Sequence, residues 1–313
     1  MRARDGVRIP SSFDRQAALA SPADTGSTHR TRASVVLVVW NQLALTQACL
    51  ESLRSSTVAF ELCVVDNGST DGTREWFEAA ASSGALSYHR NEENAGLIPA
   101  LNQGARLASG DALCFLHNDT EMLDPRWLER LLGALDSPRH VGLAGLYGVR
   151  RLRRDGRYVG RTIVHSLAGQ GGLGDDVVEV AAVDGVCLCV RRAVFEAVGG
   201  FDEGYGFLHG YDRDVSFAVR EAGWRCAVVN APFVHHGGGT RTGPAAPFRS
   251  DMDLEQRRAA LRRFAAKWRR RLPSDVRSPW RRIYERCVPH GARRPESRER
   301  GDADPRGGGG ASA

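Results

Sequence analysis

The chain has 313 residues, 42% of them hydrophobic, which is enough to bury the core of one large domain or two smaller ones. No apolar run reaches the ~20 residues of a membrane span, and the polar N-terminus lacks the apolar stretch of a secretion signal, so we expect a cytoplasmic protein. The net charge of +6 comes almost entirely from arginine, clustered at residues 150–161 and from 257 onward. Such clusters suit nucleic acid or an anionic membrane surface. Apolar residues at helical spacing within the second cluster favour a helix with a solvated basic side.

The two ends of the chain have the composition of disordered segments. Residues 1–31 have no apolar period, and the C-terminal residues are basic and then glycine-rich. We therefore expect one domain at 32–273 between a disordered tail at 1–31 and a basic, mostly disordered tail at 274–313. Seven cysteines without a Cys-x-x-Cys pair lie mostly in apolar runs, which favours buried, reduced thiols.

Between the tails, short apolar runs alternate with segments of helical spacing. Five runs predict buried strands, at 35–39, 62–65, 112–116, 186–190 and 226–229. Apolar residues recur at helical spacing after the first and third runs, over 45–53 and 127–135. This alternation predicts an α/β fold with a mostly parallel central sheet flanked by helices.

Polar residues follow the first two predicted strands. In such a sheet ligands bind beyond the carboxyl ends of the strands. Trp40 and Asn41 follow the first strand, and Asp66 opens a turn at 66–72 after the second. The turn either connects strand to helix or lets Asp66 accept a hydrogen bond from a nucleobase or a ribose.

A segment rich in asparagine and glycine spans residues 91–105. Gly96 is predicted to open a helix after Asn94, with Asn102 and Gly104 allowing a close approach to a neighbour. A plain helix with small packing residues is the alternative. The segment matches neither a phosphate-binding P-loop nor a Gly-x-Gly-x-x-Gly dinucleotide site.

Candidate metal ligands follow the third and fifth strands. Asp119 could hold a divalent cation against a diphosphate, or could cap the next helix. His235 and His236 precede three glycines, and one of them could be a second ligand. A mixed oxygen and imidazole set suits Mn²⁺, or Mg²⁺ with less histidine involvement.

Two carboxylates, Asp212 and Asp214, lie at a predicted loop-to-helix junction. A carboxylate at a helix N-terminus can stay ionised and still face a cleft, as a general base for a hydroxyl group must.

Taken together, these segments resemble family 2 of the inverting, nucleotide-sugar-dependent glycosyltransferases with the GT-A fold. The resemblance covers residues 33–272 and rests on six segments in the family's order, at 38–41, 61–73, 94–104, 116–120, 211–214 and 235–240. It implies a single GT-A domain, with a Rossmann-like nucleotide-sugar half at about 32–140 and an acceptor half at about 141–273.

The resemblance also implies roles for individual residues. Asp66 would contact the nucleobase, Asn118 the ribose, and Asp119 the metal, with His235 preferred to His236 as a further ligand. Asp212 would be the catalytic base of a single inverting displacement, which leaves Asp214 a structural role. The remaining residues of the nucleotide-sugar site would be Trp40, Asn41, Asn94, Gly96 and Asn102.

Two positions depart from the family's usual pattern. His117 stands where the metal motif usually carries a second carboxylate or an asparagine, and Tyr211 replaces the usual glutamate before Asp212. We expect Tyr211 and Asp184 to contribute to acceptor binding, with Phe207 and His209 as further candidates.

The predicted function is transfer of a sugar from a UDP-, GDP- or dTDP-linked donor to an acceptor hydroxyl, with Mn²⁺ or Mg²⁺ as cofactor. The acceptor would be a glycan, a lipid-linked glycan or a small molecule. We expect a role in cell-surface polysaccharide assembly, with a peripheral contact at the inner face of the membrane and no nucleic acid as partner. The alternatives are a nonenzymatic nucleotide-sugar-binding relative and an arginine-rich nucleic-acid-binding protein.

Overall fold

The computed structural model describes residues 32–160, 163–164, 177–236 and 250–277. The predicted tail at 1–31, most of the predicted tail at 274–313 and residues 237–240 of the histidine and glycine motif lie outside these described residues.

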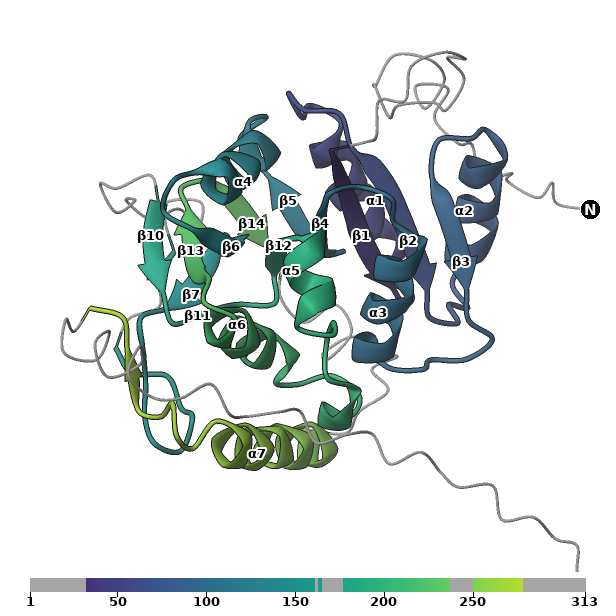
Figure 1. Cartoon of the computed structure of the whole chain (residues 1–313). Helices are drawn as coiled ribbons and strands as arrows, with labels where there is room; N and C mark the ends of the chain where they lie inside the picture. The colour runs from purple at the N-terminus through teal and green to yellow at the C-terminus, as the bar shows by residue number, and fades with distance from the viewer. Residues whose placement is uncertain (1–31, 161–162, 165–176, 237–249, 278–313) are drawn as a thin grey trace, which may run out of the picture.

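Helices and strands alternate along the first half of the chain and then give way to several short strands (Figure 1). The first half comprises β1 (Ala33–Val39), α1 (Leu43–Leu53), β2 (Glu61–Asp66), α2 (Thr73–Ser82), β3 (Ser87–Arg90), α3 (Leu97–Leu107), β4 (Ala112–His117), β5 (Thr120–Met122) and α4 (Trp127–Asp136). The second half comprises β6 (Val141–Gly145), β7 (Tyr147–Val149), β8 (Arg151–Leu152), β9 (Ile163–Val164), β10 (Val177–Val180), β11 (Ala182–Val183), β12 (Cys187–Arg191), α5 (Arg192–Ala197), the 3-10 helix η2 (Glu203–Tyr205), α6 (Tyr211–Glu221), β13 (Arg225–Val229), β14 (Phe233–His235), α7 (Ser250–Lys267) and β15 (Ser274–Asp275).

The central sheet has eight strands in the order β10-β13-β6-β12-β4-β1-β2-β3. Strands β3, β2, β1 and β4 run parallel, and β13 runs parallel to β6. Strand β12 is antiparallel to both of its neighbours, and β10 is antiparallel to β13. The predicted α/β fold with a mainly parallel sheet is therefore confirmed, and β12 joins its two halves.

All five predicted strands are present, as β1, β2, β4, β12 and β13. Strand β6, which lies inside the sheet between β13 and β12, was not predicted. Its sequence, Val-Gly-Leu-Ala-Gly, is too rich in glycine and alanine to stand out as a β-branched run. Because β13 and β12 pair with it on both edges, hydrogen bonding to its neighbours stabilises this strand although its local propensity is low.

Helices cover both faces of the sheet. On one face, buried residues of α1, α2 and α4 share a core with alternate residues of β1, namely Val35, Leu37 and Val39. On the other face α3, α5, α6 and α7 form a second core that includes Val36. The alternation follows from the two-residue period of a strand, and it produces a three-layer α/β/α domain.

Helix α7 packs across α6 and leads into the last described strand (Figure 1). Phe264 and Trp268 are buried against Phe217 of α6, which confirms the predicted apolar side of this arginine-rich helix. Beyond Pro273, the predicted end of the domain, β15 pairs with β8 and Val276 is buried. Among the described residues no helix combines the length and apolarity needed to cross a membrane. The six described cysteines are free and buried, as predicted.

Candidate active site

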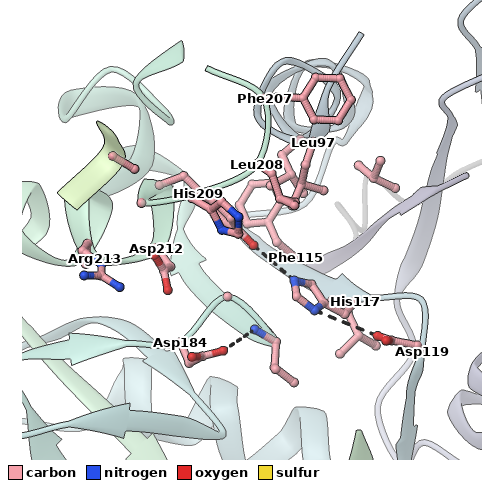
Figure 2. Close-up of a pocket in the computed structure, with 18 of the residues that line it drawn as sticks. Leu97, Phe115, His117, Asp119, Asp184, Phe207, Leu208, His209, Asp212 and Arg213 are labelled. Carbon is pink, nitrogen blue, oxygen red and sulfur yellow. Dashed lines mark hydrogen bonds and ion pairs between the residues drawn. The ribbon is translucent and has the colours of Figure 1, made fainter. Parts of the chain in front are cut away.

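A cavity of about 770 Å³ opens beyond the carboxyl ends of β1 and β4 and extends toward α6 and α7 (Figure 2). This is the edge at which parallel α/β sheets bind ligands. Eight of the predicted site residues line it: Trp40, Asn94, Asn118, Asp119, Asp184, Tyr211, Asp212 and His235. The remaining four, Asn41, Asp66, Gly96 and Asn102, are not on its wall.

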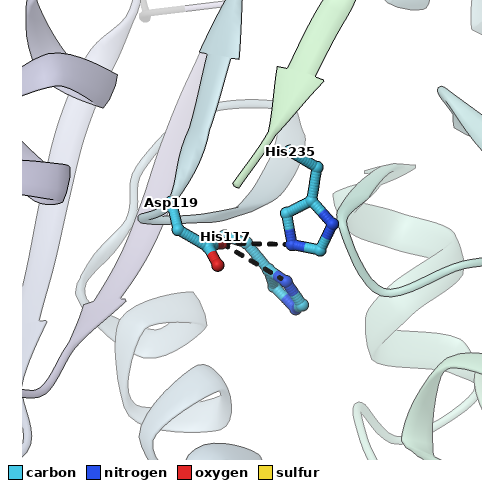
Figure 3. A group of neighbouring side chains, drawn as sticks. All are labelled: His117, Asp119 and His235. Atoms are coloured by element: carbon cyan, nitrogen blue, oxygen red, sulfur yellow. Dashed lines mark ion pairs between the residues drawn. The ribbon is translucent and has the colours of Figure 1, made fainter. Parts of the chain in front are cut away.

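His117, Asp119 and His235 form a cluster at one side of the cavity, with one ligand atom of each within 4.8 Å of the others (Figure 3). His117 ends β4, and Asp119 follows two residues later. The antiparallel pairing of β14 with β5 places His235 opposite Thr120, so its Nε2 lies 3.2 Å from Asp119 Oδ1. Residues that are distant in the sequence thereby meet at one point.

The charge on Asp119 is stabilised by its two histidine neighbours. Burial of this carboxyl would raise its pKa, but the hydrogen bond from His235 and the charges of His117 and His235 lower the pKa of Asp119 to about 2. An ionised carboxylate beside two imidazoles is a donor set that fits a divalent cation. These three residues could therefore hold a metal ion.

The structure separates the two candidate histidines. His236 Nε2 lies 2.6 Å from Glu121 Oε1, away from the cluster, while its backbone N–H donates to Asp119 O. His235 is thus the histidine beside Asp119. His117 was not predicted as a ligand, although a His-x-Asp spacing at a strand end was a signal for it.

Asp212 lies in the first turn of α6, at the far side of the cavity from Asp119 (Figure 2). Among the described residues none donates a hydrogen bond to its carboxylate, so that group is available to a bound molecule. The N-terminus of α6 carries partial positive charge that stabilises an ionised carboxylate there.

Asp184 lies near Asp212 in the same part of the cavity (Figure 2). Its carboxylate accepts a hydrogen bond from the backbone N–H of Val186. Burial of the carboxylate, and then the negative charge of Asp212, raise the pKa of Asp184 to about 7. Arg213 and Tyr158 also line this end; neither was predicted, because neither follows a predicted strand.

Asp66 is fully buried at the end of β2. Its oxygens accept hydrogen bonds from Ser69 N, from the Tyr88 hydroxyl and from Arg90, at 2.8, 2.7 and 3.1 Å. Asn41 is also buried, and its side-chain oxygen accepts from Thr70 N at 2.7 Å. Both side chains therefore stabilise the turn at 66–72 rather than facing the cavity.

Asparagines at the ends of β2 and β3 form a hydrogen-bonded cluster beside the cavity. Asn67 donates to Asn94 Oδ1 and to the Gly96 carbonyl, and its own oxygen accepts from Asn91. Asn102 instead binds the backbone of Phe201 through both its nitrogen and its oxygen. Asn67 and Asn94 thus shape the cavity wall, whereas Asn102 joins α3 to the segment before η2.

Comparison with known proteins gives a match to a family model. The model described as "Glycosyl transferase family 2" matches residues 34–199, which run from the second residue of β1 to beyond β12 and include Asp119. Two curated relatives match most of this chain but are much longer. The chain spans only 28% and 18% of their lengths. The second is the O-antigen biosynthesis protein RfbC of Myxococcus xanthus, which is 25% identical over 69% of this chain.

Two solved structures share the fold. GalNAc-T7 with UDP, GalNAc and Mn²⁺ has a TM-score of 0.56 and 18% identity, over 67% of this chain and 44% of its own. The mannosyltransferase PcManGT of Pyrobaculum calidifontis, in complex with GDP-Man and Mn²⁺, has a TM-score of 0.50 and 17% identity, over 83% of this chain and 74% of its own. At such identities the likeness is one of fold, and it confirms the predicted GT-A architecture.

Proposed function

Because the chain belongs to glycosyl transferase family 2, we propose that it transfers a sugar from a nucleoside-diphosphate sugar to an acceptor hydroxyl, with inversion at the anomeric carbon. The observation that carries this proposal is the arrangement of Asp119 with its two histidines at one side of the cavity and Asp212 at the other. The cavity of about 770 Å³ is large enough for a nucleotide sugar and part of an acceptor.

His117, Asp119 and His235 would hold a divalent cation beside the donor diphosphate. The cation, when bound, supplies positive charge that neutralises the leaving nucleoside diphosphate. Solved structures with the same fold contain UDP or GDP-Man together with Mn²⁺, which supports such a donor and such a metal for this chain. Asn94 and Asn118 line the cavity and are our candidates for donor contacts.

Asp212 would act as the general base. Its carboxylate would accept the proton of the acceptor hydroxyl while that oxygen attacks the anomeric carbon from the face opposite the leaving group. A single displacement inverts the configuration and needs one base. Asp184 and Arg213, beside Asp212, would orient the acceptor.

The acceptor that we propose is a glycan or lipid-linked glycan of surface polysaccharide assembly, which the O-antigen relative supports. Exposed arginines follow one another along and just after α7, at Arg258, Arg262, Arg269 and Arg270. They would let the protein contact anionic membrane lipids beside such an acceptor.

The test is a screen of the purified protein with Mn²⁺ against UDP-, GDP- and dTDP-sugars and candidate acceptors, following nucleotide release. We expect release with one donor and a loss of about 100-fold or more on Asp212→Asn. Asp111→Asn, at the opposite end of β4, is the matched control. Binding of a nucleotide sugar without turnover would indicate a nonenzymatic binding protein instead. Turnover unaffected by Asp212→Asn would show that Asp212 is not the base.

A further inference from the structure

His117 and Tyr211 are 94 residues apart in sequence and meet beside the proposed metal cluster. The Nε2 atom of His117 lies 3.2 Å from the Tyr211 hydroxyl oxygen, while its Nδ1 atom lies 4.0 Å from Asp119 Oδ1. The imidazole of His117 thus stands between the Tyr211 phenol on one side and Asp119 on the other.

We propose that Tyr211 is a positioning residue that holds His117 with Nδ1 toward Asp119 and His235, so that a divalent cation is bound by two imidazoles and one carboxylate and Mn²⁺ is preferred to Mg²⁺. The proposal rests on the proposed function, because it concerns the metal site of the same cavity. It assigns Tyr211 a role at the metal rather than at the acceptor.

The tautomer of His117 explains why Tyr211 matters. A neutral imidazole has one N–H and one lone pair, and the hydrogen bond at one nitrogen determines which nitrogen can bind a metal. When Nε2–H donates to the Tyr211 oxygen, the lone pair lies on Nδ1, toward Asp119. Outer hydrogen bonds of this kind orient metal-binding histidines in proteins.

Packing fixes the Tyr211 hydroxyl where His117 can reach it. Tyr211 begins α6 and is only 5% exposed, and its ring meets that of Phe201 edge-to-face with centroids 5.3 Å apart. Gly185 supplies the necessary space, because a Cβ atom there would lie 2.9 Å from Tyr211 Cζ and 3.6 Å from His117 Nε2. The phenol is therefore held in one position by a rigid surrounding.

The donor set determines the metal preference. Mg²⁺ favours oxygen ligands and retains its water, whereas imidazole nitrogen suits transition metals. A site with His117 and His235 beside one carboxylate offers two nitrogens and a single charged oxygen. Replacing His117 by aspartate would supply a second carboxylate and make the site more suitable for Mg²⁺.

The experiment measures Mn²⁺ and Mg²⁺ binding to the full chain by calorimetry without nucleotide sugar, in the wild type, Tyr211→Phe, His117→Asp and the double variant. We expect Tyr211→Phe to weaken Mn²⁺ binding about tenfold. His117→Asp should reduce the preference for Mn²⁺ over Mg²⁺, and Tyr211→Phe should have no further effect in that background. Pulsed electron paramagnetic resonance of bound Mn²⁺ should detect two coordinated imidazole nitrogens in the wild type and one in His117→Asp.

Tyr205→Phe is the matched control, because Tyr205 is another buried tyrosine whose hydroxyl donates to Asp214 of α6. It should lower the thermal stability and leave Mn²⁺ affinity unchanged. Unchanged Mn²⁺ affinity in folded Tyr211→Phe, an equal effect of that change in the His117→Asp background, or no Mn²⁺ binding by the wild type would each overturn the proposal. If Mn²⁺ binding depends on Tyr211 but no nucleotide sugar is turned over, the metal site stands and the proposed function fails.

Discussion

Asp212 and Asp214 lie two residues apart in the first turn of α6, but their carboxylates have opposite surroundings. Asp214 is 1% exposed and accepts hydrogen bonds from Tyr205, Lys267 and Trp268 at 2.9, 2.8 and 2.7 Å. The Asp212 carboxylate faces the cavity. In one helical turn, Asp214 thus joins α6 to α7, whereas Asp212 is open to a bound molecule.

We predict that Asp214→Asn lowers the free energy of unfolding by about 2 kcal/mol, because it removes one of the two carboxylates, Asp202 and Asp214, that pair with the mostly buried ammonium of Lys267. Asp212→Asn should change it by less than about 1 kcal/mol, since the favourable interaction with the helix terminus is lost but the repulsion between Asp212 and Asp184 is relieved. Urea unfolding of both variants measures the difference. Equal losses would contradict the division of roles.

Asp66→Asn should also destabilise the protein, by about 2 kcal/mol, because the buried carboxylate accepts from Ser69, Tyr88 and Arg90. Asp119→Asn should also cost stability, because the lowered pKa of Asp119 reflects a charge that the folded state stabilises, but this variant should in addition lose the stabilisation by Mn²⁺. Thermal melting with and without Mn²⁺ separates the two effects. Loss of nucleotide binding by Asp66→Asn without loss of stability would return Asp66 to the direct nucleobase contact that the resemblance implies.

The two neighbouring histidines should differ in their effect on the metal. His235→Ala removes a nitrogen that lies 3.2 Å from Asp119 Oδ1, and we expect Mn²⁺ affinity to fall by about 10- to 100-fold. His236→Ala breaks only the pair with Glu121 at the surface and should leave affinity within about twofold. Calorimetric titration with Mn²⁺ measures both. A larger loss of Mn²⁺ affinity in His236→Ala than in His235→Ala would show that His236 is the metal ligand.

Asp184 makes the stability of the protein depend on pH. Burial and the charge of Asp212 raise its pKa from an ordinary 3.8 to about 7, so between these values the folded chain keeps a proton that the unfolded chain releases. This contribution to stability is present at low pH and is lost as pH rises through 7. The free energy of unfolding of Asp184→Asn minus that of the wild type should therefore be larger at pH 8 than at pH 5. The difference should grow by up to about 1.4 kcal/mol per pH unit.

Urea unfolding at pH 5 and pH 8 measures this difference. The same comparison in the Asp212→Asn background should give a smaller change, because one cause of the raised pKa is absent. A difference between Asp184→Asn and the wild type that does not vary with pH would show that the proton is not retained.

Local sequence was sufficient to predict five strands of the central sheet and the edge at which the site forms. Runs of buried aliphatic residues predicted β1, β2 and β4, and polar residues after each run marked the carboxyl ends of parallel strands. Because those ends meet at one edge of a sheet, strand order along the chain was enough to assign Trp40 and Asp119 to the same cavity. These inferences need only a two-residue period and the chain direction.

Only the tertiary structure decided which polar side chains face the cavity and which support it. Asp66 comes directly after a predicted strand and Asn102 lies in the asparagine- and glycine-rich segment, but their hydrogen-bond partners lie in other segments and turn both side chains into the fold. The pairing of β14 with β5 distinguished His235 from His236, and the approach of α6 to β4 brought Tyr211 to His117. Such contacts join residues that are far apart in the chain, and packing determines them, so no local period in the sequence records them.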